Sequence, residues 1–269
     1  MIKHVVLIAC SLLMIYPLLW MLVSSFRPTN TIFRSPGLWL HHPTLANYTH
    51  GWNALTSPFG QYLINSGIVV VGAILGNVVS CSLAAYAFAR LKFRGRTLWF
   101  AIMLLSIMLP IHVVVVPQYI IFNNLGWVNT FIPLVLPKFL ATDAFFVFLM
   151  VQFMRGVPRE LDEAARLDGA TVFQELRYIL VPYTGKTIGV VTILMTFESL
   201  TNVTLPLIIS DGGPNNATNV YALRVLNEAF TNYHFGVAAA IGVAIFLLNL
   251  GVVIACIRNF IAAEHARVS

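Results

Sequence analysis

Long runs of apolar residues, separated by short polar segments, dominate the chain. Each run is close to the roughly 20 residues that an α-helix needs to cross a bilayer. The pattern therefore predicts an all-α membrane protein with six transmembrane helices. The expected spans cover residues of about 2–25, 63–89, 97–121, 131–154, 183–207 and 236–257.

The composition agrees with the pattern. The chain is 58% hydrophobic and only 10% charged, with a mean hydropathy of +0.82. A soluble domain carries roughly half its residues as apolar types and about a quarter as charged types. No Pro- or Gly-rich linker divides the chain, so we expect one membrane domain over 1–269. The first apolar run lacks a small-residue cleavage site and is expected to stay as a span.

The basic residues indicate how the chain is oriented. Lys and Arg mark the cytoplasmic side of a membrane protein, so the net charge of +6 does not call for a nucleic acid. With both termini in the cytoplasm, the basic residues gather inside. Only Arg27, Arg34 and Arg224 then lie outside, in loops at about 27–62 and 208–235. The loop at about 155–182 lies inside.

Proline and small residues occur at several positions within the expected spans. Four prolines are expected to bend or break helices, which releases backbone groups that need a partner or a cavity. The second span carries small residues at intervals of four, a spacing that lets membrane helices pack closely. The prolines are Pro110, Pro117, Pro133 and Pro137, and the small residues are Gly72, Gly76, Ser80 and Ala84.

The loop at 155–182 holds an unusual concentration of charge. Pro158 suits the start of a helix, and the acidic residues that follow it suit the positive end of the helix dipole. Gly169 is expected to end this helix. A second amphipathic helix is expected from Val172 to Pro182. The apolar stripe on this pair of helices predicts docking into a groove on another protein.

The sequence Glu163-Ala164-Ala165, followed by Asp168-Gly169-Ala170 and later by Pro182, resembles the EAA loop of bacterial ABC-importer permeases. In that family the loop is a coupling helix that sits in a cleft of the ATP-binding subunit. The resemblance therefore implies that Glu163, Ala164, Ala165, Asp168 and Gly169 couple this chain to an ATPase.

Other segments extend the resemblance to the carbohydrate-uptake branch of the family, of maltose and glycerol-phosphate type. Residues 17–28 and 83–90 are similar to the smaller permease of the usual heterodimer. Residues 210–218 and 235–240 are similar to the larger, solute-holding permease.

The resemblance implies a set of partners in a bacterial inner membrane. They are a dimer of ATP-binding subunits, a second homologous permease in a heterodimer, an extracytoplasmic solute-binding protein and membrane lipid. ATP and Mg²⁺ would lie on the ATP-binding partner. The chain has no P-loop, no nucleophile motif and no cluster with metal-ligand spacing, so we expect no catalytic residue, metal or cofactor here.

Polar residues inside two apolar runs are candidates for contact with a solute. An Asp or Lys at the centre of a membrane helix costs roughly 3 kcal/mol, so such residues usually face the interior. The fourth run carries Lys138, Thr142, Asp143 and Phe145, and the fifth carries Glu198, Ser199 and Asn202. The spacing of 138, 142 and 145 places them on one helical face. The resemblance puts Lys138, Thr142, Phe145, Ser199 and Asn202 on solute-binding positions of the family.

A structural role for these residues is the alternative. Lys138 and Asp143 are five apart, which is a poor spacing for an ion pair in a helix, and Lys138 could extend to the outer surface. Glu198 could pair with a neighbouring subunit. Asn and Ser side chains often form hydrogen bonds between helices without any solute.

Two other classes of function stay open. A self-contained secondary transporter or channel for a small polar solute needs no ATPase, but an inverted repeat is its usual sign. An intramembrane enzyme needs a catalytic pair, and Asp143, Glu198 and His112 form no known motif. Importers of oligosaccharides, monosaccharides and glycerol phosphate share the motifs of this family, so the resemblance does not name the solute. Lys138 would suit an anionic one.

Overall fold

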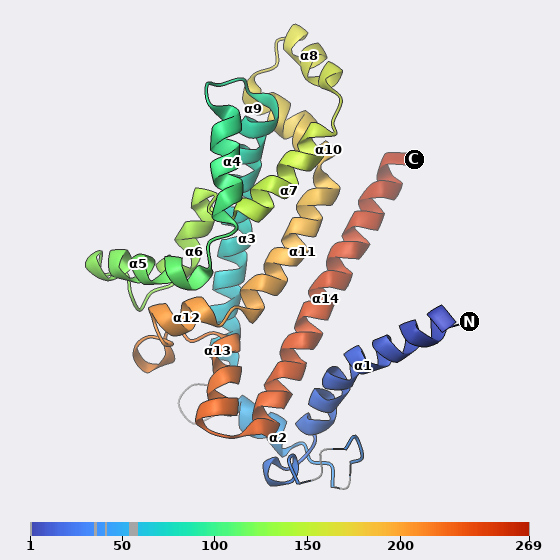
Figure 1. Ribbon diagram of the computed structural model, residues 1–269, viewed down its shortest axis with the longest axis vertical. Helices are drawn as coiled ribbons and strands as arrows, with labels where there is room; N and C mark the ends of the chain where they lie inside the picture. Colours follow the sequence, from blue (N-terminus) through green and yellow to red (C-terminus); the bar gives the residue numbers. More distant parts are fainter. Residues whose placement is uncertain (1, 35–36, 41, 54–58, 269) are drawn as a thin grey trace.

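The computed structural model describes residues 2–34, 37–40, 42–53 and 59–268, and the side chains of 3–258 within those ranges. The described part is built from helices that run mostly along one long axis (Figure 1). The longer helices are α1 (Ile2–Ser25), α3 (Phe59–Arg90), α4 (Arg96–Ser106), α5 (Ile111–Asn124), α7 (Ala144–Arg155), α11 (Gly185–Thr201) and α14 (Phe235–Val268).

Shorter helices fill the connections. They are α2 (Ala46–Trp52), α6 (Ile132–Val135), α8 (Arg159–Leu167), α9 (Val172–Glu175), α10 (Val181–Tyr183), α12 (Thr204–Ile209) and α13 (Tyr221–Leu226). Short 3₁₀ turns cover Thr29–Thr31, Leu136–Leu140 and Pro214–Asn216, and π-helical turns cover Leu176–Leu180 and Asn227–Thr231.

Among the described residues, four segments are long and apolar enough to cross a membrane: Lys3–Ser25, Phe59–Arg90, Ile132–Arg155 and Phe235–Arg258. Two bent pairs of helices, α4 with α5 and Val172–Tyr183 with α11, bring the number to six if each pair is one span. The all-α class is confirmed. The six-span count and the side of the termini stay predictions.

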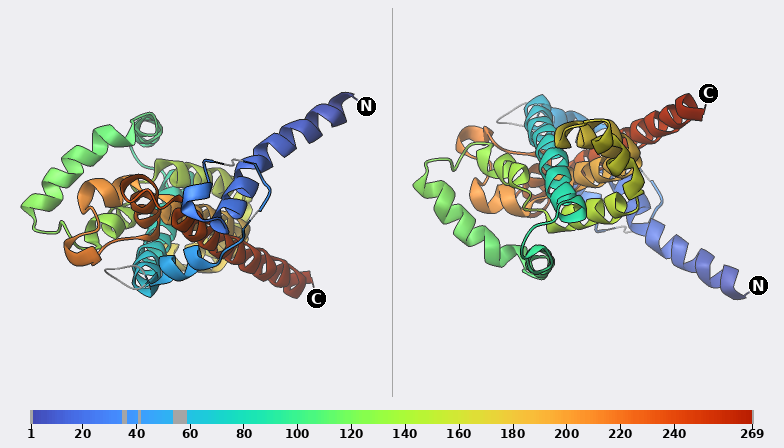
Figure 2. Two further views of the ribbon diagram at one scale, coloured as in Figure 1. Left: turned by 90° about the horizontal axis from the view of Figure 1, so that it is seen from below. Right: turned by 90° about the horizontal axis from the view of Figure 1, so that it is seen from above.

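The third expected span, 97–121, is broken at the first of its prolines. Helices α4 and α5 meet at 99°, and α5 projects sideways from the other helices (Figures 1 and 2). Pro110 has an extended backbone and directly precedes α5, as expected for a residue that cannot continue a helix. Pro117 lies inside α5 without ending it. The prediction that these prolines bend or break helices is therefore confirmed at Pro110 by a break, whereas α5 continues through Pro117 without one.

The fourth and fifth expected spans are also interrupted. The fourth is not one helix, because Ala141 adopts a left-handed conformation (φ 53°) between the turn Leu136–Leu140 and α7. The fifth ends at Thr201, and Asn202 has an extended ψ of 115° before α12 begins. The expectation that 138, 142 and 145 share one helical face is therefore wrong, and so is the expectation of a continuous helix over 183–207.

The row of small residues on α3 packs against the interrupted segment. A Cβ atom at Gly72 would lie 2.7 Å from Val135 Cγ1, and one at Gly76 would lie 2.5 Å from Phe139 Cδ2. Ser80 continues the row and donates a hydrogen bond to the Lys138 carbonyl (2.8 Å). The prediction that this ridge permits close helix packing is confirmed.

The main core lies between α3, α7 and α11. Its largest fully buried side chains include Met150, Met154, Leu180 and Met195, and the same cluster holds the small residues Ala85 and Ala89 of α3. Unbranched Met side chains fill the irregular gaps that such bent segments leave. This packing fixes α3 between the two interrupted spans.

The loops expected outside and inside lie at opposite ends of the molecule (Figure 1). Helices α2 and α13 lie at one end, where Asn65 of α3 donates to the carbonyls of Ala217 and Asn219. The loop at 208–235 contains the sequence Asp-Gly-Gly-Pro-Asn-Asn at 211–216. It begins with positive φ angles at Asp211, Gly212 and Gly213, as expected for such turn-forming residues. Helix α8 lies at the other end.

Candidate functional site

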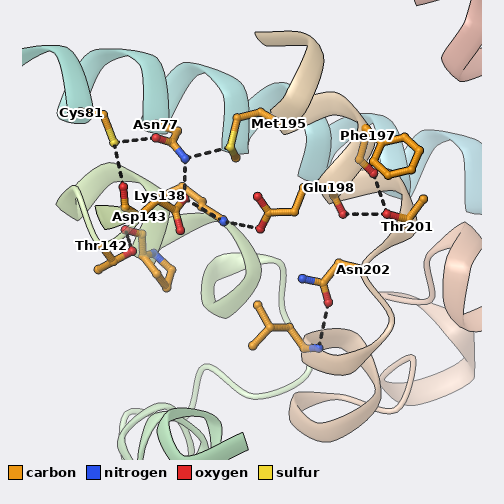
Figure 3. A network of polar contacts seen from close by, with 12 residues as sticks. Asn77, Cys81, Lys138, Thr142, Asp143, Met195, Phe197, Glu198, Thr201 and Asn202 are labelled. Carbon is orange, nitrogen blue, oxygen red and sulfur yellow. Dashed lines mark hydrogen bonds and ion pairs between the residues drawn. The ribbon is translucent and has the colours of Figure 1, made fainter. Parts of the chain in front are cut away.

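An ion-pair network joins the two interrupted spans (Figure 3). Lys138 Nζ lies 2.9 Å from Asp143 Oδ2 and 3.2 Å from Glu198 Oε1. The expectation that Lys138 and Asp143 are poorly placed to pair is wrong, because it assumed an unbroken helix between them. The alternative in which Lys138 extends to the outer surface is not what the structure shows, since its ammonium group binds two acids within this chain.

Helix α3 completes the network from the opposite side. The amide of Asn77 donates hydrogen bonds to Asp143 Oδ2 and to Met195 Sδ (2.9 Å), and its oxygen accepts one from Cys81 Sγ (2.6 Å). Asn77 is fully buried. It was missed in the sequence, although a lone Asn within a long apolar run is a signal for a buried polar contact.

The break before α7 is stabilised by polar side chains. The backbone N–H of Ala141 donates to Ser80 Oγ (3.1 Å), and Thr142 Oγ1 donates to the Pro137 carbonyl (2.9 Å). Backbone groups that leave a helix at membrane depth need such partners or a water-lined cavity. The break presents Thr142 and Asp143 to the neighbouring cavities.

A cavity of about 710 Å³ opens beside this network. Its volume is in the range of pockets that hold small molecules. Its polar lining residues are Ser106, Gln118, Lys138, Thr142, Asp143, Glu198, Thr201, Asn202 and Thr204. A second cavity of about 460 Å³ shares Thr142, Asp143 and Glu198 and adds the aromatic residues Phe145, Phe146 and Phe197.

The structure brings together four of the five predicted solute contacts. Lys138, Thr142 and Asn202 line the larger cavity, and Phe145 lines the smaller one. Ser199 lines neither cavity. Asn202 Oδ1 also accepts a hydrogen bond from the Leu205 N–H (3.3 Å) after α11 has ended.

The charges around the larger cavity sum to an excess of one negative charge. Lys138 supplies one ammonium group, and Asp143 and Glu198 supply two carboxylates. The side chain of Glu198 is 43% exposed, whereas that of Lys138 is 12% exposed. The charge most accessible from the cavity is therefore a carboxylate and not the ammonium group.

The coupling loop is exposed at the far end of the molecule. Helix α8 begins after Pro158 and ends before Gly169, whose φ is +82°, and both limits agree with the sequence prediction. Glu163, Ala164 and Asp168 are exposed, as is Gly169, and Ala165 is half-buried. Leu167 is 89% exposed, which is unusual for a leucine on an ordered helix.

One ion pair attaches this loop to α3, and a second joins α8 to α9 within the loop. Arg90 Nη1 lies 3.1 Å from Asp162 Oδ2, and Arg166 binds Glu175 through two nitrogens at 3.0 and 3.2 Å. Burial raises the pKa of the Asp162 carboxyl above its ordinary value, and the Arg90 guanidinium opposes that shift. None of these four residues was identified as functional from the sequence.

The chain is similar to permease proteins of known uptake systems. A diacetylchitobiose uptake system permease protein of Streptomyces coelicolor is 34% identical over 181 residues, which cover 67% of this chain and 59% of that protein. The chain thus spans less than two thirds of this relative. An sn-glycerol-3-phosphate transport system permease protein of Agrobacterium fabrum is 27% identical over 248 residues, covering 89% of this chain and 87% of that protein.

A solved structure shares the fold. A chain from a bacterial ABC transporter involved in the import of the acidic polysaccharide alginate superimposes with a TM-score of 0.75 and 18% sequence identity, covering 96% of this chain and 95% of that one. The family described as "Binding-protein-dependent transport system inner membrane component" matches residues 76–263, which is more than half of the chain. This protein therefore belongs to the family of binding-protein-dependent transport system inner membrane components.

Proposed function

We propose that this chain is the membrane-spanning subunit of an ATP-driven importer. It receives a sugar or a related polyol from an extracytoplasmic binding protein and passes the solute into the cytoplasm. The observation that carries the proposal is α8, a charged helix with an exposed leucine at one end of an otherwise apolar molecule. The family membership and the sugar-uptake names of the relatives support it.

Helix α8 is the docking element in this proposal. Glu163, Ala164, Asp168 and Gly169 are exposed, and Ala165 is half-buried beside them, so a partner can reach this surface. A helix that enters a groove on a partner presents apolar and small residues there. A dimer of ATP-binding subunits, one subunit on this chain and one on a second homologous permease, is the proposed partner.

The two cavities beside Lys138 are the proposed solute path. The larger one offers hydroxyl and amide groups from Thr142 and Asn202, and the smaller one offers the ring of Phe145. Sugars present hydroxyl groups and flat C–H surfaces, for which such groups are suitable partners. Ser199 is not part of this proposal, because it lines neither cavity.

The charge balance favours an uncharged solute. The sequence favoured an anionic solute because of Lys138, but its ammonium group already binds Asp143 and Glu198. An anion entering the larger cavity would meet the half-exposed carboxylate of Glu198 first. A neutral oligosaccharide would instead form hydrogen bonds with that carboxylate.

Uptake into proteoliposomes tests this function. The chain is reconstituted with its ATP-binding and permease partners, with ATP inside and the binding protein outside. Diacetylchitobiose, maltose, glycerol 3-phosphate and alginate oligosaccharides serve as probes. We expect uptake that requires internal ATP and favours the neutral probes. Uptake by the chain alone, driven by an ion gradient and indifferent to ATP, would support a self-contained secondary transporter or channel and overturn the proposal.

A further inference from the structure

Helix α8 is held to the molecule by a charge and not by apolar packing. Its single buried residue is Asp162, and its leucines Leu161 and Leu167 are both exposed. An amphipathic helix normally attaches through its apolar face. Here the apolar residues are left for a partner, and the attachment to the membrane helices depends on the Asp162 carboxylate.

The partner of Asp162 connects the two long helices of the core. Arg90 is the last residue of α3, and its side chain is 2% exposed. One of its terminal nitrogens, Nη1, pairs with Asp162, and the other, Nη2, donates to the carbonyls of Met154 and Val157 (2.8 Å each) at the end of α7. A displacement of the Asp162 side chain would therefore pull on Arg90 and, through it, on the ends of both α3 and α7.

A second contact joins the other half of the loop to the same face of α3. Tyr86 lies one helical turn before Arg90, and its hydroxyl donates to Glu175 Oε1 (3.2 Å). Glu175 is buried, and it also receives both hydrogen bonds from Arg166 of α8. Two bonds from a planar guanidinium to one carboxylate fix orientation as well as distance.

Helix α3 then reaches the polar network beside the cavities. Arg90 lies thirteen positions after Asn77, which corresponds to about 20 Å of helix. Asn77 binds Asp143, and Asp143 binds Lys138. One continuous helix thus carries both loop contacts at its cytoplasmic end and the Asp143 contact further along.

We propose that the Arg90–Asp162 pair and the Tyr86–Glu175–Arg166 cluster transmit movement of the coupling helix through α3 to the Lys138–Asp143–Glu198 network. These residues are positioning residues that act behind the docking surface. The inference rests on the proposed function, because it needs an ATP-binding partner that moves α8. Coupling between distant sites through such contacts commonly changes an equilibrium by about 5- to 150-fold.

Accessibility of a cysteine in the larger cavity tests the proposal. Thr201 is exposed and lines that cavity, and its hydroxyl donates to the backbone carbonyls of Phe197 (2.8 Å) and Glu198 (3.5 Å) rather than to a charged group of the network. Thr201→Cys therefore serves as the reporter, with Cys10 and Cys256 replaced by serine and the buried Cys81, which binds Asn77, retained. The assembled transporter is labelled with a membrane-impermeant maleimide, with and without ATP. Its ATP-binding subunit carries a substitution that blocks hydrolysis, so that ATP holds the nucleotide dimer closed.

In the reporter protein we expect ATP to change the labelling rate severalfold. Asp162→Asn removes the charge but keeps the size, and we expect it to reduce that ATP-dependent change at least fivefold while the ATP-binding subunit still co-purifies. Asp162→Glu should restore most of the change. Glu160→Gln, which alters an exposed acid on the same helix, is the matched control and should behave like the reporter protein.

The other outcomes separate the inference from the proposed function. An unchanged ATP response in Asp162→Asn would overturn the inference. Loss of the ATP-binding subunit from Asp162→Asn alone would also overturn it, since Asp162 would then act in docking. Tyr86→Phe provides a second variant, which removes a hydroxyl group but no charge. We expect it to reduce the ATP-dependent change in labelling rate, as Asp162→Asn does. Absence of any ATP response in the reporter protein would instead contradict the proposed function.

Discussion

Lys138 Nζ lies 3.2 Å from Glu198 Oε1, although the two residues are 60 positions apart in the sequence. The contact joins the turn Leu136–Leu140 to α11 and places an ammonium group between two carboxylates. It explains why Lys138 can lie within an apolar segment, since a paired charge avoids most of the cost of an isolated one. It also removes Lys138 as a counter-ion for an anionic solute.

The first prediction concerns this ion pair. Lys138→Met leaves Asp143 and Glu198 without a counter-charge, and breaking a buried pair on one side costs about 3 kcal/mol or more. We expect the free energy of unfolding to fall by about that amount, measured by SDS-induced unfolding followed by circular dichroism. Adding Asp143→Asn should restore part of the loss. A Lys138→Met variant as stable as the wild type would refute the structural role of the pair.

The second prediction concerns the ridge on α3. Gly76→Ala would place a Cβ atom 2.5 Å from the ring of Phe139, and overpacking of this kind costs about 2 kcal/mol. Gly67→Ala on the same helix meets no atom within 4 Å and is the control. We expect Gly76→Ala to lower the melting temperature and Gly67→Ala to leave it unchanged. Equal melting temperatures would show that α3 and the 132–140 segment pack less closely than described.

The third prediction concerns docking. Leu167→Ser removes the most exposed leucine of α8, and loss of an apolar anchor commonly costs about 2 kcal/mol, a roughly thirtyfold weaker complex. We expect far less ATP-binding subunit to co-purify. Trp39→Ser changes an exposed apolar residue in the loop between α1 and α2 and should leave the recovery unchanged. Equal recovery for both variants would mean that α8 is not the docking element.

The fourth prediction separates two of the solute contacts implied by the resemblance. Phe145 lines the smaller cavity, whereas Ser199 lines neither. An aromatic face contributes about 1 kcal/mol beyond its area, so Phe145→Ala should raise the KM of ATP-dependent uptake about fivefold. Ser199→Ala should leave KM unchanged. The reverse result would place the solute on the opposite face of α11.

Much of the architecture could be predicted from the hydrophobic pattern. The chain is an inner-membrane component of a binding-protein-dependent transport system, as its apolar runs and its EAA motif indicate. The limits of α8 follow from Pro158 and Gly169, because both residues restrict where a helix can start or stop. These features depend on local sequence, which is why no tertiary information was needed.

The interruptions of the spans could not be predicted in the same way. Ala141 carries no sequence signal for a left-handed conformation, which it adopts where Ser80 of α3 provides a hydrogen bond to its backbone N–H. Pro117 was expected to bend or break a helix, and α5 continues through it. The conformation of Ala141 depends on a neighbour that is 61 positions away in the sequence.

The contacts of the buried charges were also beyond the sequence. Asn77, Arg90 and Glu175 find their partners across 66, 72 and 9 positions, respectively, and the two long separations leave no periodic pattern. The spacing of five residues even argued against an ion pair between Lys138 and Asp143, because that argument assumed a regular helix between them. Polar residues in apolar runs thus identify that a network exists but not which residues pair.

The central claim is that α8 joins this chain to an ATP-binding partner. The most direct measurement is the subunit composition, by mass spectrometry, of the complex extracted gently with the tagged chain. We expect an ATP-binding subunit and a second permease in fixed ratio to it, and loss of the ATP-binding subunit when 163–169 are altered. Recovery of this chain alone, stable and monodisperse, would contradict the claim.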